Sequence, residues 1–176
     1  MVGEEKTLDS RRIFSGRVIG LRVDRVALPS GGESLREIVE HRGAVVIAAV
    51  NERQEVMLVR QYRKAVEEVL WELPAGTLEP DEEPLACARR ELKEETGLEA
   101  REWQLLVQFY SSPGFCTERL YLFMATGLTE GRQATDTDEN LTCHWVPLEQ
   151  AWAMARRGEI ADAKTLVGLL ALKCWA

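Results

Sequence analysis

The segment from Pro84 to Thr96 constrains the fold more than any other, because it carries the signals of one amphipathic helix. Pro84 stands where a helix accepts proline best, in the first turn, and Gly97 stands where helices commonly end. Between these two signals, small or apolar side chains recur at helical spacing, at Leu85, Ala88, Leu92 and Thr96. The pattern predicts a helix over residues 84–96 with one buried stripe.

Three carboxylates stand on the same predicted helix. Glu91, Glu94 and Glu95 occupy positions i, i+3 and i+4, and we expect all three on one side, opposite the apolar stripe. Their mutual repulsion costs about a few tenths of a kcal/mol per pair in water. A hard cation such as Mg²⁺ prefers carboxylate oxygens and would turn this repulsion into binding. The helix alone leaves open both a metal site and a solvated acidic face without a ligand.

The residues around the helix favour the metal site. The run reads Gly76-x5-Glu82-x7-Arg90-Glu91-Leu92-x-Glu94-Glu95-x-Gly97-Leu98. It resembles the Nudix box at every defined position, and so long a pattern is far more specific than a lone glycine motif. The resemblance implies that Glu91 and Glu95 bind Mg²⁺, for which Mn²⁺ or Zn²⁺ are substitutes, and that Glu94 binds it directly or through water. It also implies a catalytic supporting role for Glu82 and Arg90, and a metal-binding backbone carbonyl at Ala75.

Beyond the box, the chain resembles the ADP-ribose pyrophosphatases within the Nudix family. Residues 40–45, 59–63 and 71–76 look like the runs that precede the box in those enzymes, and residues 112–115 look like a turn that follows it. A proline at the position of Pro113 marks the ADP-ribose branch, although Pro113-Gly114 alone is typical of an ordinary turn. Signatures of relatives that cleave NADH or CoA are missing.

The same resemblance implies several substrate-binding residues. Arg63 matches an arginine that contacts substrate, Glu37 matches an acid on the adenine side, and Glu118 matches an acid that follows the turn at Pro113 and Gly114. Trp71, close to the start of the box, is a further candidate for lining the cleft. Leu35 stands where some relatives have a second arginine, so this chain departs from them on the adenine side.

An acidic segment at residues 136–139 precedes a predicted strand. The resemblance places Glu139 at the catalytic glutamate, acting as a general base or as a metal ligand once substrate closes the loop. Asp138 is the neighbour that would take this role if Glu139 did not. The alternative interpretation is an acidic loop tip with no function.

The remaining elements predict an α+β fold. Short β-like runs separated by glycines predict a small N-terminal antiparallel sheet from residues 12–14, 18–26 and 35–41. The apolar runs 44–50 and 56–59 predict two strands that pair with each other. Further strands are expected at residues 105–110, 120–125 and 141–146, and further helices at 148–157 and 163–175. The resemblance implies the Nudix fold, an α/β/α sandwich with a mixed sheet. We therefore expect an N-terminal β segment at 1–42 and a Nudix domain at 43–176.

Composition excludes several classes of protein. The 176 residues carry a formal net charge of −7, which disfavours nucleic acid as a partner. No apolar run approaches the roughly 18 residues of a membrane-spanning helix, and the N-terminus has no apolar secretion signal. The four cysteines form no C-x-x-C pair, so reduced thiols are expected. We therefore expect a cytoplasmic protein that does not bind membranes.

These features predict a Mg²⁺-dependent hydrolase that splits ADP-ribose into AMP and ribose 5-phosphate. Two alternatives remain: a diphosphatase for another nucleoside diphosphate sugar such as GDP-mannose, and a Nudix-fold binding module without turnover. In similar enzymes the N-terminal segment crosses to the other subunit. The resemblance therefore implies a C₂ homodimer in which Glu37 acts in trans.

Overall fold

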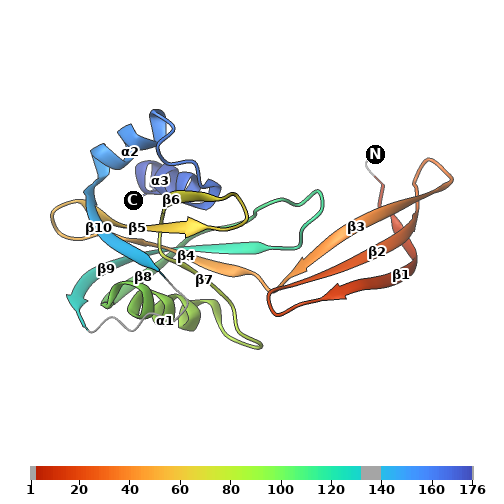
Figure 1. Ribbon diagram of the computed structural model, residues 1–176, viewed down its shortest axis with the longest axis horizontal. Helices are drawn as coiled ribbons and strands as arrows, with labels where there is room; N and C mark the ends of the chain where they lie inside the picture. Colours follow the sequence, from red (N-terminus) through yellow and green to blue (C-terminus); the bar gives the residue numbers. More distant parts are fainter. Residues whose placement is uncertain (1–2, 132–139, 176) are drawn as a thin grey trace. The chain divides into compact units, whose positions relative to one another are not determined.

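A computed structural model describes residues 3–131 and 140–175 and divides the chain into two compact units. The first unit contains the chain up to Gly43 together with Tyr110–Arg119, and the second contains Ala44–Phe109 and the chain from Leu120 onward. In Figure 1 most of the first unit is drawn in red and orange. The expected division after residue 42 remains a proposal, and the structure adds residues 110–119 to the N-terminal unit.

The first unit is built on a three-stranded antiparallel sheet. Its strands, in the order β1-β2-β3, are β1 (Lys6–Ser15), β2 (Ile19–Ala27) and β3 (Glu33–His41). Gly31 and Gly32 turn the chain between β2 and β3 with φ of 90° and 87°, a conformation that glycine adopts at little cost. In these three strands only Asp24 and Val26 are buried. The expected hairpins are confirmed, but the sheet has almost no core of its own.

The second unit contains two sheets. One is antiparallel, in the order β10-β5-β6, and consists of β5 (Glu55–Arg63), β6 (Glu68–Glu72) and β10 (Leu141–Pro147). The other runs in the order β7-β4-β9-β8 and consists of β4 (Ala44–Ala49), β7 (Ala75–Thr77), β8 (Leu98–Tyr110) and β9 (Arg119–Glu130). Because β4 is parallel to β9 and antiparallel to β7, the second sheet is mixed, as expected.

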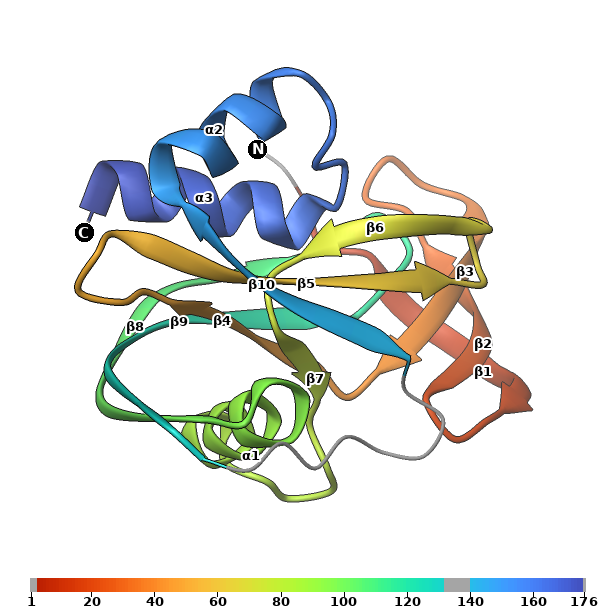
Figure 2. The ribbon, with the colours of Figure 1, turned by 60° about the vertical axis from the view of Figure 1, so that its left-hand side comes forward.

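Helices cover both faces of the mixed sheet. The second unit contains α1 (Pro84–Thr96), α2 (Leu148–Arg156) and α3 (Ala163–Trp175). Both α1 and α3 contact β4, and Figure 2 shows α1 on one side of the sheets and α2 with α3 on the other. Alternate residues of β4 therefore enter two cores, Ile47 with the residues of α1 and Val46 with those of α3. The α+β sandwich is confirmed. No helix within the described ranges is long and apolar enough to cross a membrane.

The expected pairing of the two apolar runs is wrong. Strands β4 and β5 lie in different sheets, and among the described residues the only backbone pairing between these two runs is an isolated bridge from Val50 to Val56. A run buried on both faces shows that a strand is internal, but it does not identify the neighbours. The short strands β6 and β7 were also not expected, because the residues that form them lack a clear alternating pattern.

Helix α1 begins and ends as expected, but one of its carboxylates lies on the unexpected face. Gly97 adopts the left-handed conformation with φ of 72°, and its N–H bonds to the carbonyl of Lys93. Glu95 is only 2% exposed, on the buried side of the helix with Ala88 and Leu92. Successive residues of an α-helix are rotated by about 100° around the helix axis. Glu95, three residues after Leu92, therefore lies nearer the side of Leu92 than the solvent-facing side. The expectation that all three acids oppose the apolar stripe is therefore wrong for Glu95.

Candidate active site

Arg90 is the centre of the acidic cluster on α1. Its Nε and Nη2 donate to the two carboxylate oxygens of Glu82, each at 3.0 Å. Its Nη1 donates to Glu91 at 2.7 Å and to Glu94 at 2.9 Å. The structure thus brings together four residues that the sequence assigned to catalysis or metal binding. The guanidinium group of Arg90 therefore balances part of the charge of these three carboxylates and orients them.

The loop before α1 is fixed through Glu82. The fork of hydrogen bonds from Arg90 holds the pKa of the Glu82 carboxyl at about 2, and this effect exceeds the opposite effect of burial. The backbone N–H of Glu79 also donates to Glu82, at 2.9 Å. The same fork raises the pKa of Arg90 above its ordinary value. The ion pair therefore ties the loop to the helix at every physiological pH.

We expect Glu82→Gln to lower the free energy of unfolding at pH 7 by about 2 kcal/mol, because it removes a charged hydrogen-bonded pair. The ordinary pKa of the carboxyl is 4.5 and the folded-state pKa is about 2. The stabilisation is therefore present above pH 4.5 and is lost as the pH falls toward 2. Urea unfolding of both proteins should show a difference that shrinks below pH 4.5. A difference that stays the same at all pH values would contradict this origin.

Glu91 lies directly against the first glycine of the box. A Cβ atom placed on Gly76 would lie 1.8 Å from Cδ and 2.0 Å from Oε1 of Glu91. Such distances are far shorter than any contact between non-bonded atoms, so only glycine leaves room for this carboxylate. Gly76 has no positive φ. The glycine is therefore needed for space rather than for an unusual backbone conformation.

Glu95 contacts the same strand at the residue before Gly76. Its Oε2 accepts a hydrogen bond from the backbone N–H of Ala75 at 3.2 Å. Strand β7 begins at Ala75, and Ala75 and Gly76 pair with Val46 and Val45 of β4. Two carboxylates of α1 therefore lie against one dipeptide, Ala75-Gly76, whose position is fixed by the mixed sheet.

The donor atoms at Ala75-Gly76 suit a hard divalent cation. The carboxylates of Glu91 and Glu95 and the carbonyl of Ala75 offer only oxygen, the element that Mg²⁺ takes as ligand. In the described part of the chain, no three His, Cys, Asp or Glu side chains are gathered as a metal-binding group. Arg90 instead draws Glu91 and Glu94 toward itself. The residues fit a cation, and metal binding stays a prediction.

Arg63 is held by a carboxylate that the sequence did not single out. Its Nε and Nη2 donate to the two oxygens of Glu72, each at 2.7 Å. Glu72 is fully buried and also accepts a hydrogen bond from Lys164 of α3. The only sequence signal for this site was the position of Glu72 next to the expected substrate residue Trp71. Its other partner, Lys164 on α3, is distant in sequence, and no sequence pattern indicated it.

Trp71 is not brought to the carboxylates of α1. Its ring meets that of His144 edge to face, with centroids 5.0 Å apart, and Arg60 lies over it at 5.5 Å. Trp71 pairs with Arg60 while Glu72 pairs with Val59, so Trp71 and Glu72 point to opposite faces of the sheet. A contact between Trp71 and substrate stays a prediction.

The first unit gathers the other predicted substrate residues. Segment 110–119 lies beside β3, because Val39 forms a bridge with Cys116 and exchanges backbone hydrogen bonds with Phe115 and Thr117. This pairing brings the strand of Glu37 next to the turn that contains Pro113 and Gly114. The carboxylate of Glu118 lies 3.7 Å from Nδ1 of His41, and Glu37 is exposed. Glu139 and its neighbour Asp138 lie outside the described residues.

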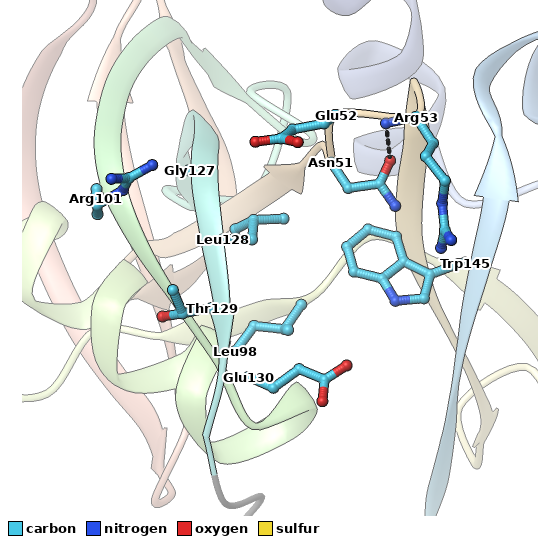
Figure 3. A pocket seen from close by; sticks show the side chains of 10 residues that line it. All are labelled: Asn51, Glu52, Arg53, Leu98, Arg101, Gly127, Leu128, Thr129, Glu130 and Trp145. Carbon is cyan, nitrogen blue, oxygen red and sulfur yellow. Dashed lines mark hydrogen bonds between the residues drawn. The ribbon is translucent and has the colours of Figure 1, made fainter.

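A separate cavity of about 430 Å³ opens at the turn between β4 and β5. Figure 3 shows its lining, with the ring of Trp145 opposite Leu128 and the carboxylates of Glu52 and Glu130 at its edges. The Asn51 side chain accepts a hydrogen bond from the backbone N–H of Arg53 at 2.9 Å and stabilises the turn. Among the described residues, none of the predicted site residues lines this cavity. Its exposed residues therefore provide control positions for the chemistry at α1.

Comparison with known proteins gives two family matches. Residues 40–167 match the NUDIX domain, and residues 5–39 match the nucleoside diphosphate sugar hydrolase N-terminal domain. The chain is 44% identical to a Bacillus subtilis protein named ADP-ribose pyrophosphatase, over 92% of this chain and 89% of the relative. It is 42% identical to the methanol dehydrogenase activator of Bacillus methanolicus, over 94% and 91%. It is 38% identical to the GDP-mannose pyrophosphatase of Citrobacter koseri, over 75% and 74%.

A solved structure supports the fold independently of sequence. The crystal structure of an ADP compounds hydrolase superposes with a TM-score of 0.88, covering 99% of this chain and 95% of that chain. The two sequences are 20% identical, so the likeness concerns the fold alone. The expected Nudix fold is confirmed.

Proposed function

Because the chain belongs to the Nudix hydrolase family, we propose that it hydrolyses the pyrophosphate bond of ADP-ribose and releases AMP and ribose 5-phosphate. The observation that carries this proposal is the position of Glu91 and Glu95 against Ala75-Gly76. The name of the Bacillus subtilis relative supports the substrate, and the matched N-terminal domain supports the class of nucleoside diphosphate sugars.

We propose Mg²⁺ as the cofactor, with Mn²⁺ and Zn²⁺ as substitutes. Glu91, Glu95 and the Ala75 carbonyl would hold it, and Glu94 would bind directly or through water. A bound divalent cation neutralises the charge that develops on the diphosphate. Arg90 and Glu82 would orient the carboxylates throughout the reaction. We assign removal of the proton from the attacking water to Glu139, and Asp138 is the alternative.

Each predicted substrate residue is assigned a contact of its own. Arg63 would contact the diphosphate, because an arginine fork matches phosphate oxygens and Nη1 of Arg63 donates to no acceptor among the described residues. Glu37 and Glu118 would bind the nucleoside side near the turn of Pro113 and Gly114. Trp71 would line the cleft.

A panel of nucleoside diphosphate sugars tests the function. ADP-ribose and GDP-mannose are incubated with the protein in Mg²⁺ and in excess chelator, and the products are separated by chromatography. We expect AMP and ribose 5-phosphate from ADP-ribose in Mg²⁺ only. Faster turnover of GDP-mannose would favour the alternative that the Citrobacter koseri relative suggests. Binding without any product would indicate a non-catalytic module.

We propose that the protein forms a C₂ homodimer in which the N-terminal segment completes the site of the other subunit. The N-terminal strands bury only two residues. A three-stranded sheet needs a covered apolar face to be stable. The large apolar side chains that remain exposed in this segment are Leu8, Ile13, Phe14, Val18, Ile19 and Leu35. A second copy would cover this surface.

Mixing two inactive variants tests the exchange of segments. Glu37→Ala and Glu91→Gln are combined in equal amounts under conditions that exchange subunits. Random exchange makes about half of the dimers hybrids, and each hybrid has one intact site of its two. Activity should therefore recover to about a quarter of the wild-type value. The unmixed variants serve as controls. No recovery despite proven exchange, or a fully active monomer in light scattering, would rule out a trans role for Glu37.

The cysteines support a cytoplasmic location, which we propose for this protein. In the described part of the chain, no disulfide joins any of the four cysteines, Cys87, Cys116, Cys143 and Cys174. Burial raises the pKa of the Cys87 and Cys143 thiols, so they remain protonated and poorly nucleophilic. Free thiols persist in a reducing compartment, where disulfides are rare.

A further inference from the structure

A buried ionic network joins the end of β6 to the start of α3. The carboxylate of Glu72, with its side chain 1% exposed, accepts two hydrogen bonds from Arg63 at 2.7 Å and one from Nζ of Lys164 at 2.5 Å. Burial alone would raise the pKa of Glu72, but Arg63 and Lys164 together outweigh burial and lower it. Glu72 is therefore an ionised carboxylate shared by two cations.

The start of α3 fixes the position of Lys164. Nζ of Lys164 also donates to Oδ1 of Asp162 at 2.9 Å. The other oxygen of Asp162 accepts hydrogen bonds from the backbone N–H and the hydroxyl of Thr165, at 3.0 and 2.6 Å, and so caps the helix. The network contains two cations and two carboxylates and is balanced in charge. The ammonium group of Lys164 consequently has one defined position.

Two further contacts lock α3 onto the residue that follows Glu72. The backbone N–H of Leu73 donates to the hydroxyl of Thr165 at 2.8 Å. A Cβ atom on Gly168 would lie 2.2 Å from Cδ1 of Leu73, so this glycine admits the leucine side chain. Both Leu73 and Thr165 are fully buried. Helix α3 is thus a rigid support for the segment that carries Glu72.

We propose that Lys164 is a positioning residue for Arg63 and acts through Glu72. An arginine can meet a carboxylate through Nε and Nη2 or through its two terminal nitrogens. Nζ of Lys164 and Nη2 of Arg63 share Oε2 of Glu72, so Lys164 fixes this carboxylate where Arg63 meets it through Nε and Nη2, and Nη1 is not used by Glu72. The inference rests on the proposed function, in which Arg63 binds the diphosphate.

Kinetics of three lysine variants test this role. Lys164→Met removes the ammonium group and should raise the KM for ADP-ribose about tenfold while kcat changes less than about threefold. Lys164→Arg keeps a cation and should restore KM to within about threefold of wild type. Lys173→Met, on the same helix with its ammonium over Trp152, is the matched control and should leave KM unchanged. A wild-type KM for Lys164→Met would overturn the proposal.

A double-mutant cycle separates positioning from a general effect on the fold. In an Arg63→Met background, Lys164→Met should change KM no further, because the residue through which it acts is absent. Independent multiplication of the two effects would overturn the proposal. If Lys164→Met does not fold, Lys164→Gln takes its place in the same cycle.

Failure of the proposed function gives a different result. If the proposed function is wrong, the wild-type protein itself does not hydrolyse ADP-ribose, whatever the variants do. Hydrolysis by wild type, together with a wild-type KM in Arg63→Met, would instead leave the function intact and overturn the positioning role.

Discussion

Replacement of Glu91 or Glu95 by glutamine is expected to lower kcat by at least about a hundredfold, with little change in the fold. Glutamine has the shape of glutamate and can still accept the hydrogen bonds that Arg90 and Ala75 donate in the structure. It lacks the negative charge that a divalent cation requires. The loss should therefore appear in catalysis and in the concentration of Mg²⁺ needed for half-maximal rate.

The measurement is steady-state hydrolysis of ADP-ribose over a range of Mg²⁺ concentrations, with circular dichroism to check the fold. Glu52→Gln, an exposed carboxylate at the cavity of Figure 3, makes the same chemical change away from α1 and should keep the wild-type rate. Near-wild-type turnover by either box variant at saturating Mg²⁺ would disprove the assignment of the metal ligands.

Local sequence signals were sufficient to predict α1. Proline in the first turn and glycine just after the last turn act within a few residues, and the helix occupies the expected residues 84–96. It was harder to predict which residues lie on the buried face of the helix. A polar residue next to the apolar stripe can be buried if a hydrogen-bonding partner lies within its reach. Glu95 has such a partner in the N–H of Ala75.

Contacts between distant residues could not be predicted. The apolar run of β4 predicts a buried strand. It does not indicate that β4 pairs with β7 and β9, because this pairing depends on how the whole unit packs. The hydrogen bond between Glu72 and Lys164 joins residues 92 positions apart. No periodicity or motif connects such positions, so the support for Arg63 emerged only from the structure.

Replacement of Gly76 by alanine is expected to lower kcat by about a hundredfold or more, although the new methyl group is small. The added Cβ would occupy the space of the Glu91 carboxylate, with Cγ, Cδ and Oε1 of that side chain all within 2.3 Å. Glu91 is a flexible side chain, so it can move aside at modest cost in stability. Displacement of this carboxylate from Ala75-Gly76 removes a ligand from the proposed metal site.

A double-mutant cycle with Glu91→Gln decides whether the glycine acts through this carboxylate. If it does, Gly76→Ala should add little to the loss already caused by Glu91→Gln, since a displaced ligand and a neutral ligand fail for the same reason. Thermal unfolding of Gly76→Ala should remain a single transition near that of wild type. Full activity of Gly76→Ala would show that Glu91 need not lie against the glycine during catalysis. Losses that multiply in the double variant would assign the glycine a role of its own in the loop.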